Sequence, residues 1–144
     1  MELVVKVATN EKELQDAFYV RKTVFVEEQN VPTEREQDEY ESESAHFVLY
    51  ENGEPVGAGR FRTIGNVGKV ERICVLKEKR NHGYGKIMME KIEQYAKEHG
   101  VPKLKLNAQL QAIPFYLRIG YKEETGEVFL DAGIPHKTMV KELE

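Results

Sequence analysis

The stretch from Val70 to Lys86 constrains the chain most, because it reads as a buried strand, a glycine turn and the start of a helix. Residues 70–76 are apolar and β-prone with two charges among them, as in a mostly buried strand. From residue 87 to 99 the apolar residues repeat with the 3.6-residue period of a helix. Gly83 and Gly85 allow a tight turn whose N–H groups stay uncovered. Because the free N–H groups and the dipole of a helix N-terminus attract anions, we interpret this turn as a phosphate or pyrophosphate cradle.

The spacing of the turn excludes the two commonest phosphate-binding motifs. The chain has no Gly-x-x-x-x-Gly-Lys-Ser/Thr sequence, and Met88 stands where a dinucleotide-binding Gly-x-Gly-x-x-Gly has its third glycine. What remains is Arg-x-x-Gly-x-Gly, from Arg80 to Gly85. It resembles the pyrophosphate-binding signature Gln/Arg-x-x-Gly-x-Gly/Ala of the GNAT superfamily of acetyl-CoA-dependent N-acyltransferases. An ordinary strand-to-helix turn is the alternative, because a lone Gly-x-Gly is a weak signal.

Length and composition predict one globular, soluble domain spanning residues 1–144, since 40% of the residues are hydrophobic and 32% are charged. No apolar run is long enough to cross a membrane, and the N-terminus lacks the pattern of a secretory signal. Cys74 is the single cysteine, so no internal disulfide can form and a cytoplasmic location is expected. The histidines have no metal-ligand spacing, which predicts no metal site. The net charge of −4 argues against nucleic acid as a partner.

The apolar patterns predict an α+β fold with a mixed, mostly antiparallel sheet, and the family resemblance implies that helices flank this sheet in a three-layer sandwich. Strands are expected at residues 2–8, 46–50, 55–63, 69–76, 103–108, 121–130 and 136–143, and helices at about 11–26, 87–99 and 111–119. Asn52-Gly53 predicts a hairpin between the second and third strands. The strand–helix–strand unit across residues 69–108 predicts one parallel, right-handed connection.

This order of elements is that of the GNAT fold, and two further matches extend the resemblance. Residues 112–121 are similar to the family's closing motif, in which a Phe-Tyr pair precedes Gly-Phe or Gly-Tyr. Residues 24–32 and 131–136 are similar to the ElaA/YjcF-like group of small bacterial acetyltransferases. The resemblance implies acetyl-CoA as a co-substrate, held by Ile73, Cys74, Val75, Arg80, Asn81, His82, Gly83, Tyr84, Gly85, Lys86 and Gln109. Gln109 stands where the family often has Asn, so the amide is retained with a longer reach.

Acetyl transfer to an amine needs a base for the ammonium group and a proton for the leaving thiolate. The resemblance implies Tyr116 as the general acid, with packing against the pantetheine arm as the alternative. Glu71, on the strand before the glycine turn, is the expected base, and a structural ion pair with a neighbouring arginine is the alternative. His136 is the rival base through the ElaA-like match. Cys74 is interpreted as a small buried hydrophobe rather than a nucleophile.

Eight carboxylates lie between Glu27 and Ser44. Such a density is typical of a solvated loop or short helix, or of an acidic rim that attracts a cationic acceptor. The function expected is direct acetyl transfer to the primary amine of a cationic acceptor, and the sequence leaves a homodimer open. A non-catalytic acyl-CoA-binding or regulatory module of the same fold is one alternative, and a phosphate binder unrelated to CoA is another.

Overall fold

The computed structural model describes residues 2–144 and contains one eight-stranded sheet. Its strands are β1 (Leu3–Val7), β2 (Ala45–Glu51), β3 (Glu54–Ile64), β4 (Val67–Val75), β5 (Lys103–Gln109), β6 (Lys122–Glu123), β7 (Phe129–Asp131) and β8 (Ile134–Glu142). Their order across the sheet is β1-β2-β3-β4-β5-β8-β6, and β7 pairs with β8. Of these pairings, only β4 with β5 is parallel. The predicted mixed, mostly antiparallel sheet and its parallel connection are therefore confirmed.

Helices fill the segments between the strands. They are α1 (Glu11–Arg21), the π-helix η1 (Lys22–Glu28), α2 (Thr33–Glu36), α3 (Tyr84–Glu98), α4 (Ile113–Arg118) and the short 3₁₀-helices η2 (Glu41–Glu43), η3 (Lys77–Lys79) and η4 (Leu110–Ala112). The side chain of Asn10 caps α1 by accepting a hydrogen bond from the Glu13 N–H at 2.8 Å. The first helix extends through η1 to Glu28, two residues past its predicted end, with wider π turns in its last part.

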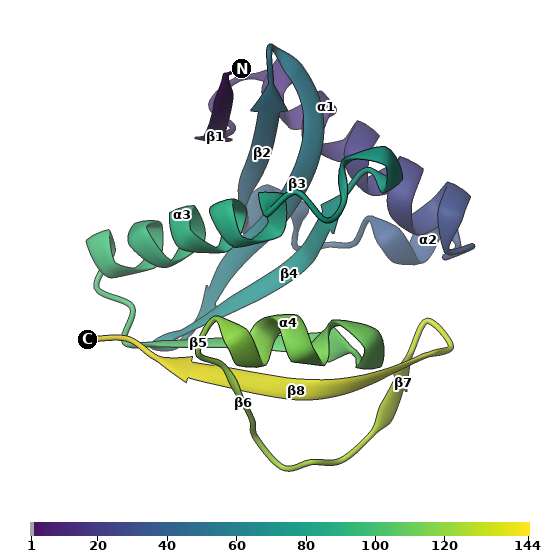
Figure 1. The fold of residues 1–144 in the computed structure, drawn as a ribbon. Helices are drawn as coiled ribbons and strands as arrows, with labels where there is room; N and C mark the ends of the chain where they lie inside the picture. Colours follow the sequence, from purple (N-terminus) through teal and green to yellow (C-terminus); the bar gives the residue numbers. More distant parts are fainter. Residues whose placement is uncertain (1) are drawn as a thin grey trace.

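The helices cover both faces of the sheet, which gives the predicted three layers (Figure 1). On one face α1 packs Val20 against Val48 of β2 and Ala58 of β3. On the other face α3 and α4 enclose a larger apolar cluster that includes Ile92 and Tyr116. The apolar stripe predicted from the 3.6-residue period is the side of α3 that faces this cluster.

Two local predictions had different outcomes. Asn52 and Gly53 have φ angles of 51° and 84°, as a type I′ hairpin turn requires, so the β2–β3 hairpin is confirmed. The single strand predicted over residues 121–130 is wrong, because only the short strands β6 and β7 form there. The connecting residues 124–128 are exposed, and Gly126 at a φ of 79° turns the chain away from the sheet.

The parallel strands β4 and β5 separate part of the way along their length. They pair only from Val67 to Val70 on β4 and from Lys103 to Leu106 on β5. Figure 1 shows the two strands side by side at one end and diverging toward the ends that lead into α3 and α4. The divergence leaves backbone groups of both strands without a partner strand between them, and this is where the candidate site lies.

Candidate functional site

A cleft of about 1340 Å³ follows the divergence of β4 and β5. One end, here called the turn end, is lined by Asn81, Gly83 and Gly85 at the start of α3. The opposite end, here called the hairpin end, is lined by the segment around α2 and by the β7–β8 hairpin with His136. Tyr116 of α4 also lines the cleft. The structure therefore brings the predicted cradle, acid and rival base to one cavity.

The two glycines of the predicted cradle are needed for different reasons. Gly83 is the N-cap of α3 with a φ of 80°, a left-handed conformation that side chains disfavour, and no atom would lie within 4 Å of a Cβ added there. The N–H groups that follow it are therefore open to the cleft. A Cβ on Gly85 would instead meet the ring of Phe115 at 3.3 Å, so this glycine lets α3 approach α4. The close approach of Gly85 to Phe115 was not predicted from the sequence.

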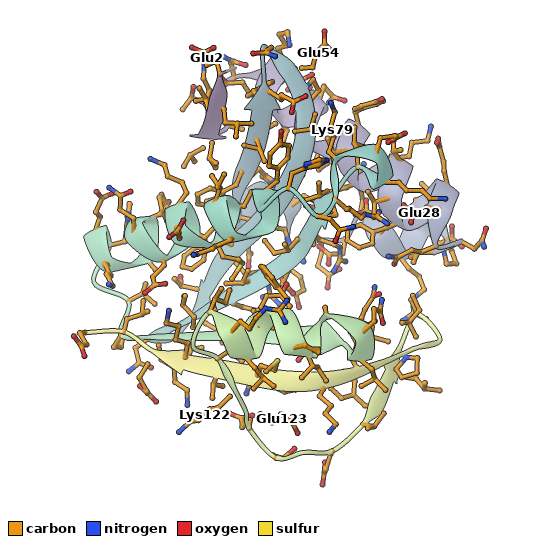
Figure 2. All side chains as sticks on the ribbon, in the orientation of Figure 1. Glu2, Glu28, Glu54, Lys79, Lys122 and Glu123 are labelled. Atoms are coloured by element: carbon orange, nitrogen blue, oxygen red, sulfur yellow. The ribbon has the colours of Figure 1, made fainter. Side chains whose placement is uncertain are left out.

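Arg80, which the family resemblance implied as a contact of acetyl-CoA, does not offer a free charge at the turn end. Its guanidinium donates to both carboxylate oxygens of Glu28 at 2.7 and 2.6 Å, and its Nε donates to the Val75 carbonyl at 2.9 Å. The hydrogen bonds with Glu28 raise the pKa of Arg80 and lower that of Glu28. Figure 2 shows Glu28 and Lys79 on the same side of the molecule, away from Lys122 and Glu123 on β6. Arg80 therefore braces the end of β4 against η1.

Lys86 and Arg118 are the two cations of the turn end that are better placed for an anion. Lys79 is less available, because it donates to Glu51 at 2.6 Å, and the Tyr84 hydroxyl donates to the same carboxylate. Lys86 and Arg118 also line the cleft, and neither forms an ion pair with any residue in the described range 2–144. Arg118 was missed by sequence reasoning, since only the packing of α4 beside α3 brings it to this end.

A β-bulge at Arg72 interrupts the pairing of β4 with β3. Glu71 lies opposite Arg60 and Cys74 lies opposite Ala58, so two residues of β4 face one residue of β3. Arg72 has a φ of 60°, which is unfavourable for a residue with a side chain. Its guanidinium donates to the Glu36 carbonyl at 3.1 Å and the Arg35 carbonyl at 3.3 Å. The side chain thus ties the segment around α2 to the bulge.

Three carboxylates of the acidic segment fit neither of the predicted interpretations. Glu36 pairs with Arg21 at 2.7 Å, and Asp38 pairs with Arg60 at 2.7 Å. Glu41 contacts both arginines, at 2.7 and 2.9 Å. Arg21 and Arg60 have no exposed surface, and Glu36 is 3% exposed. These groups form an internal network rather than a solvated loop or an attractive rim, so the density of carboxylates does not support a cationic acceptor.

Glu71 is held in the ion pairs that the sequence analysis gave as the alternative to a base. Its Oε1 accepts hydrogen bonds from Arg60 Nη2 and Arg62 Nε, both at 2.8 Å. Burial alone would raise the pKa of Glu71, but the hydrogen bonds from Arg62 and Arg60 outweigh it and lower the pKa. A carboxylate with a lowered pKa is a weak proton acceptor, so the geometry disfavours Glu71 as the direct base.

Tyr116 and Cys74 lie in the interior. Tyr116 is 8% exposed, and its ring packs edge-on against Phe115 and Tyr121 at centroid distances of 5.0 and 5.7 Å. Burial raises the pKa of the Tyr116 phenol, which keeps the phenol protonated and able to donate at neutral pH. Burial also raises the pKa of Cys74 to about 12, and its side chain packs in the cluster under α1. Cys74 is therefore a buried thiol, as interpreted, and not a thiolate nucleophile.

The predicted polar groups on β5 and β8 have defined partners. The Gln109 amide donates to Gln29 of η1 at 2.9 Å and accepts from Gln111 at 2.5 Å, so both ends of the amide are engaged. His136, opposite Gln109 in the sheet, stacks on Phe129 at 5.9 Å. Its Nδ1 is 2.6 Å from the Ile134 carbonyl. A carbonyl can only accept, so Nδ1 carries the proton and Nε2 keeps its lone pair.

No group of three or more His, Cys, Asp or Glu side chains within residues 2–144 is arranged to hold a metal ion. Among the helices in the described part of the chain, none is long and apolar enough to cross a membrane.

Comparisons with known proteins agree with this geometry. A family model for the Acetyltransferase (GNAT) domain matches residues 7–143. The uncharacterized N-acetyltransferase YjcF of Bacillus subtilis strain 168 is 54% identical over 136 residues, covering 94% of this chain and 97% of YjcF. Escherichia coli ElaA shares the fold with a TM-score of 0.83 at 23% identity, covering 97% of this chain and 98% of that one. A GNAT family acetyltransferase from Elizabethkingia anophelis, solved with acetyl-CoA bound, has a TM-score of 0.75 at 14% identity over 98% of each chain. The chain therefore belongs to the GNAT acetyltransferase family and is an N-acetyltransferase that uses acyl-CoA.

Proposed function

We propose that residues 1–144 act as one domain that transfers an acetyl group directly from acetyl-CoA to a primary amine. The observation that carries this proposal is the position of Tyr116 in the cleft between the diverging strands, with the open glycine turn of α3 at one end. The N–H groups after Gly83 suit a pyrophosphate, and Lys86 and Arg118 add positive charge. The backbone of Ile73 and Val75 suits the pantetheine arm, because β4 has no partner strand on that side.

Proton transfer sets the roles of the side chains. A lysine-like amine of pKa ~10.4 is neutral in about one molecule in 2,500 at pH 7, equivalent to roughly 4.6 kcal/mol of barrier. We assign the proton acceptor to His136, whose Nε2 has no hydrogen-bond partner among the described residues, whereas two arginines lower the pKa of Glu71. We assign the donor for the leaving thiolate to Tyr116, which remains protonated at neutral pH. Asn81, Tyr84 and Gln109 line the cleft and are retained as proposed contacts of the co-substrate. His82 lies between Asn81 and Gly83 in the turn but does not line the cleft, so its proposed role has no support from the geometry.

The test is acetyl-CoA turnover with a broad panel of amines, read as free thiol, in the parent and in Tyr116→Phe. The substitution keeps the ring and removes only the hydroxyl, so acid catalysis predicts a single-turnover rate lower by about 10²-fold with little change in acetyl-CoA affinity. Tyr121→Phe is the matched control, because the Tyr121 hydroxyl is buried without a partner among the described residues and lies outside the main cleft. A Tyr116→Phe rate within about threefold of the parent contradicts the assignment.

The alternatives give different results in the same measurements. A non-catalytic acyl-CoA-binding module binds acetyl-CoA without turning over any amine. A phosphate binder unrelated to CoA shows no preference for CoA over ATP in a thermal-shift experiment.

A further inference from the structure

We propose that the acceptor amine carries a carboxylate, which Lys69 and Asn107 bind in the cleft where β4 and β5 begin to separate, next to the hairpin end. The inference rests on the proposed function, because it names the class of acceptor for the same site. It replaces the cationic acceptor expected from the acidic segment.

The polar side chains at this end share one face of the sheet. Lys69 lies opposite Lys105 across the parallel pair, and Asn107 lies two residues further along the same face of β5. Gln109 follows on that face, opposite His136 of β8. Its hydrogen bond to Gln29 of η1 shows that this is the face covered by η1 and α2. Lys69 and Asn107 therefore line the same cleft as His136, the assigned proton acceptor.

The negative charge at the hairpin end is already neutralised. The carboxylates that line it are Glu36, Asp38, Glu71 and Asp131, and their ion-pair distances to arginines are 2.7, 2.7, 2.8 and 3.7 Å. The other carboxylates of residues 27–43 that are exposed, which are Glu27, Glu28, Glu34, Glu39 and Glu43, do not line the cleft. A cationic acceptor would therefore meet no carboxylate at this end that lacks an arginine partner.

Two hydrogen-bond donors remain available there. Lys69 is half-buried, lines the cleft and forms no ion pair with any other residue of the described range. Asn107 Oδ1 accepts a hydrogen bond from Thr138 Oγ1 at 2.9 Å, which orients the amide and leaves its NH₂ group to donate. Lys105 differs from its neighbour Lys69, since it pairs with Glu124 at 3.2 Å and does not line the cleft.

An ammonium group and an amide NH₂ group together match the charge and the acceptor atoms of one carboxylate. His136 Nε2, on the same face, can then take the amine proton. The step balances as follows: His136 takes one proton from the ammonium, the C–N bond forms, the C–S bond breaks and Tyr116 gives its proton to the thiolate. The second proton that the new amide nitrogen must lose goes to the Tyr116 phenolate and restores the phenol.

The experiment compares amino acids with their own primary amides as acceptors, using acetyl-CoA turnover read as free thiol. A nearby carboxylate makes an amine more basic, so chemistry alone favours the amide at neutral pH. We expect kcat/KM to favour the free acid by at least about tenfold despite this bias. Equal rates, or a preference for the amides or for a diamine, overturn the inference while leaving the proposed acetyl transfer intact.

Two lysine variants locate the effect. Lys69→Gln should lower kcat/KM for the acids by about tenfold, leave the amides within about twofold and leave the KM for acetyl-CoA unchanged. Lys105→Gln is the matched control, on the same face but outside the cleft, and should change neither class of acceptor. A Lys69→Gln effect of equal size on acids and amides overturns the inference.

A binding measurement keeps the inference testable without turnover. Calorimetry in the presence of CoA should show N-acetyl amino acids binding at least about tenfold more tightly than N-acetyl amino acid amides, with the difference lost in Lys69→Gln. If no amine is acetylated but this selectivity holds, the proposed function fails and the carboxylate site stands. If the two ligands bind equally, the carboxylate site is excluded.

Discussion

At the scale of single residues, the choice between His136 and Glu71 depends on which group is the better proton acceptor. His136 donates from Nδ1 to the Ile134 carbonyl, which fixes the ring and leaves Nε2 unprotonated in the neutral form. Glu71 accepts from Arg60 and Arg62 and has a lowered pKa, which favours a structural role. The sequence could not separate them, because both are single titratable residues on strands.

We expect His136→Gln to lower kcat/KM about 10²-fold for an amine of ordinary basicity, because the ammonium then loses its proton acceptor. An amine of low basicity, such as methoxyamine, is already neutral at pH 7 and should be affected much less. Glu71→Gln is the comparison variant, and it should reduce stability and affect both amines alike. Equal losses for both amines in His136→Gln would instead indicate that His136 only supports the structure.

At the scale of elements, the bulge in β4 joins a strained residue to the segment that covers the hairpin end. Arg72 has a left-handed φ of 60°, and the hydrogen bonds of its side chain with the Glu36 and Arg35 carbonyls offset the backbone strain. Glycine at this position relieves the backbone strain but loses these contacts, whereas alanine loses the contacts and keeps the strain. The two substitutions therefore separate the backbone from the side chain.

We expect Arg72→Gly to be more stable than Arg72→Ala by about 1 kcal/mol in urea unfolding, the reverse of the usual order in a strand. Thr63, an exposed residue of β3, is the control, where alanine should be the more stable substitution. Both Arg72 variants should raise the acceptor KM and leave the acetyl-CoA KM nearly unchanged, because the lost contacts lie at the hairpin end. The usual order at position 72 would show that the bulge does not hold the left-handed conformation in solution.

At the scale of the whole molecule, local sequence signals predicted most of the fold. The Asn52-Gly53 turn, the 3.6-residue period of α3 and the strand–helix–strand order each have a short-range cause. The strand expected over residues 121–130 failed because its apolar positions are separated by an exposed polar loop at Gly126. The turn end of the site could be predicted because its signal, the glycine spacing, is also local in the sequence.

The hairpin end could not be predicted, because its character depends on contacts between distant residues. Arg21 meets Glu36 and Glu41 from 15 and 20 positions away, and Arg60 meets Asp38 from 22 positions away. A count of carboxylates carries no information on which arginine neutralises each of them. The left-handed conformation of Arg72 could not be predicted either, since a left-handed residue that is not glycine leaves no signal in the sequence.

The same arginine–carboxylate network makes the stability of the molecule depend on acid pH. It joins α1 through Arg21, the segment around α2 through Asp38 and Glu41, β3 through Arg60 and β4 through Glu71. Burial opposes ionisation of these three carboxylates, but hydrogen bonds from the arginines outweigh it and lower each pKa. A group with a lowered folded pKa stabilises the fold above its unfolded pKa of about 4, and that stability is lost as the pH falls through the folded value.

We therefore expect the free energy of unfolding in urea to change little between about pH 7 and about pH 5 and to fall as the pH is lowered further through the folded pKa values, and we expect Arg60→Met to reduce this dependence. Without Arg60, Asp38 and Glu71 lose a buried partner, so the variant should be less stable by about 3 kcal/mol at pH 7 and should lose less on acidification. Lys12→Met is the control, because Lys12 is exposed and its pair with Asp16 on α1 should contribute little to stability. An Arg60→Met variant with the full acid dependence of the parent would show that other carboxylates control the acid unfolding.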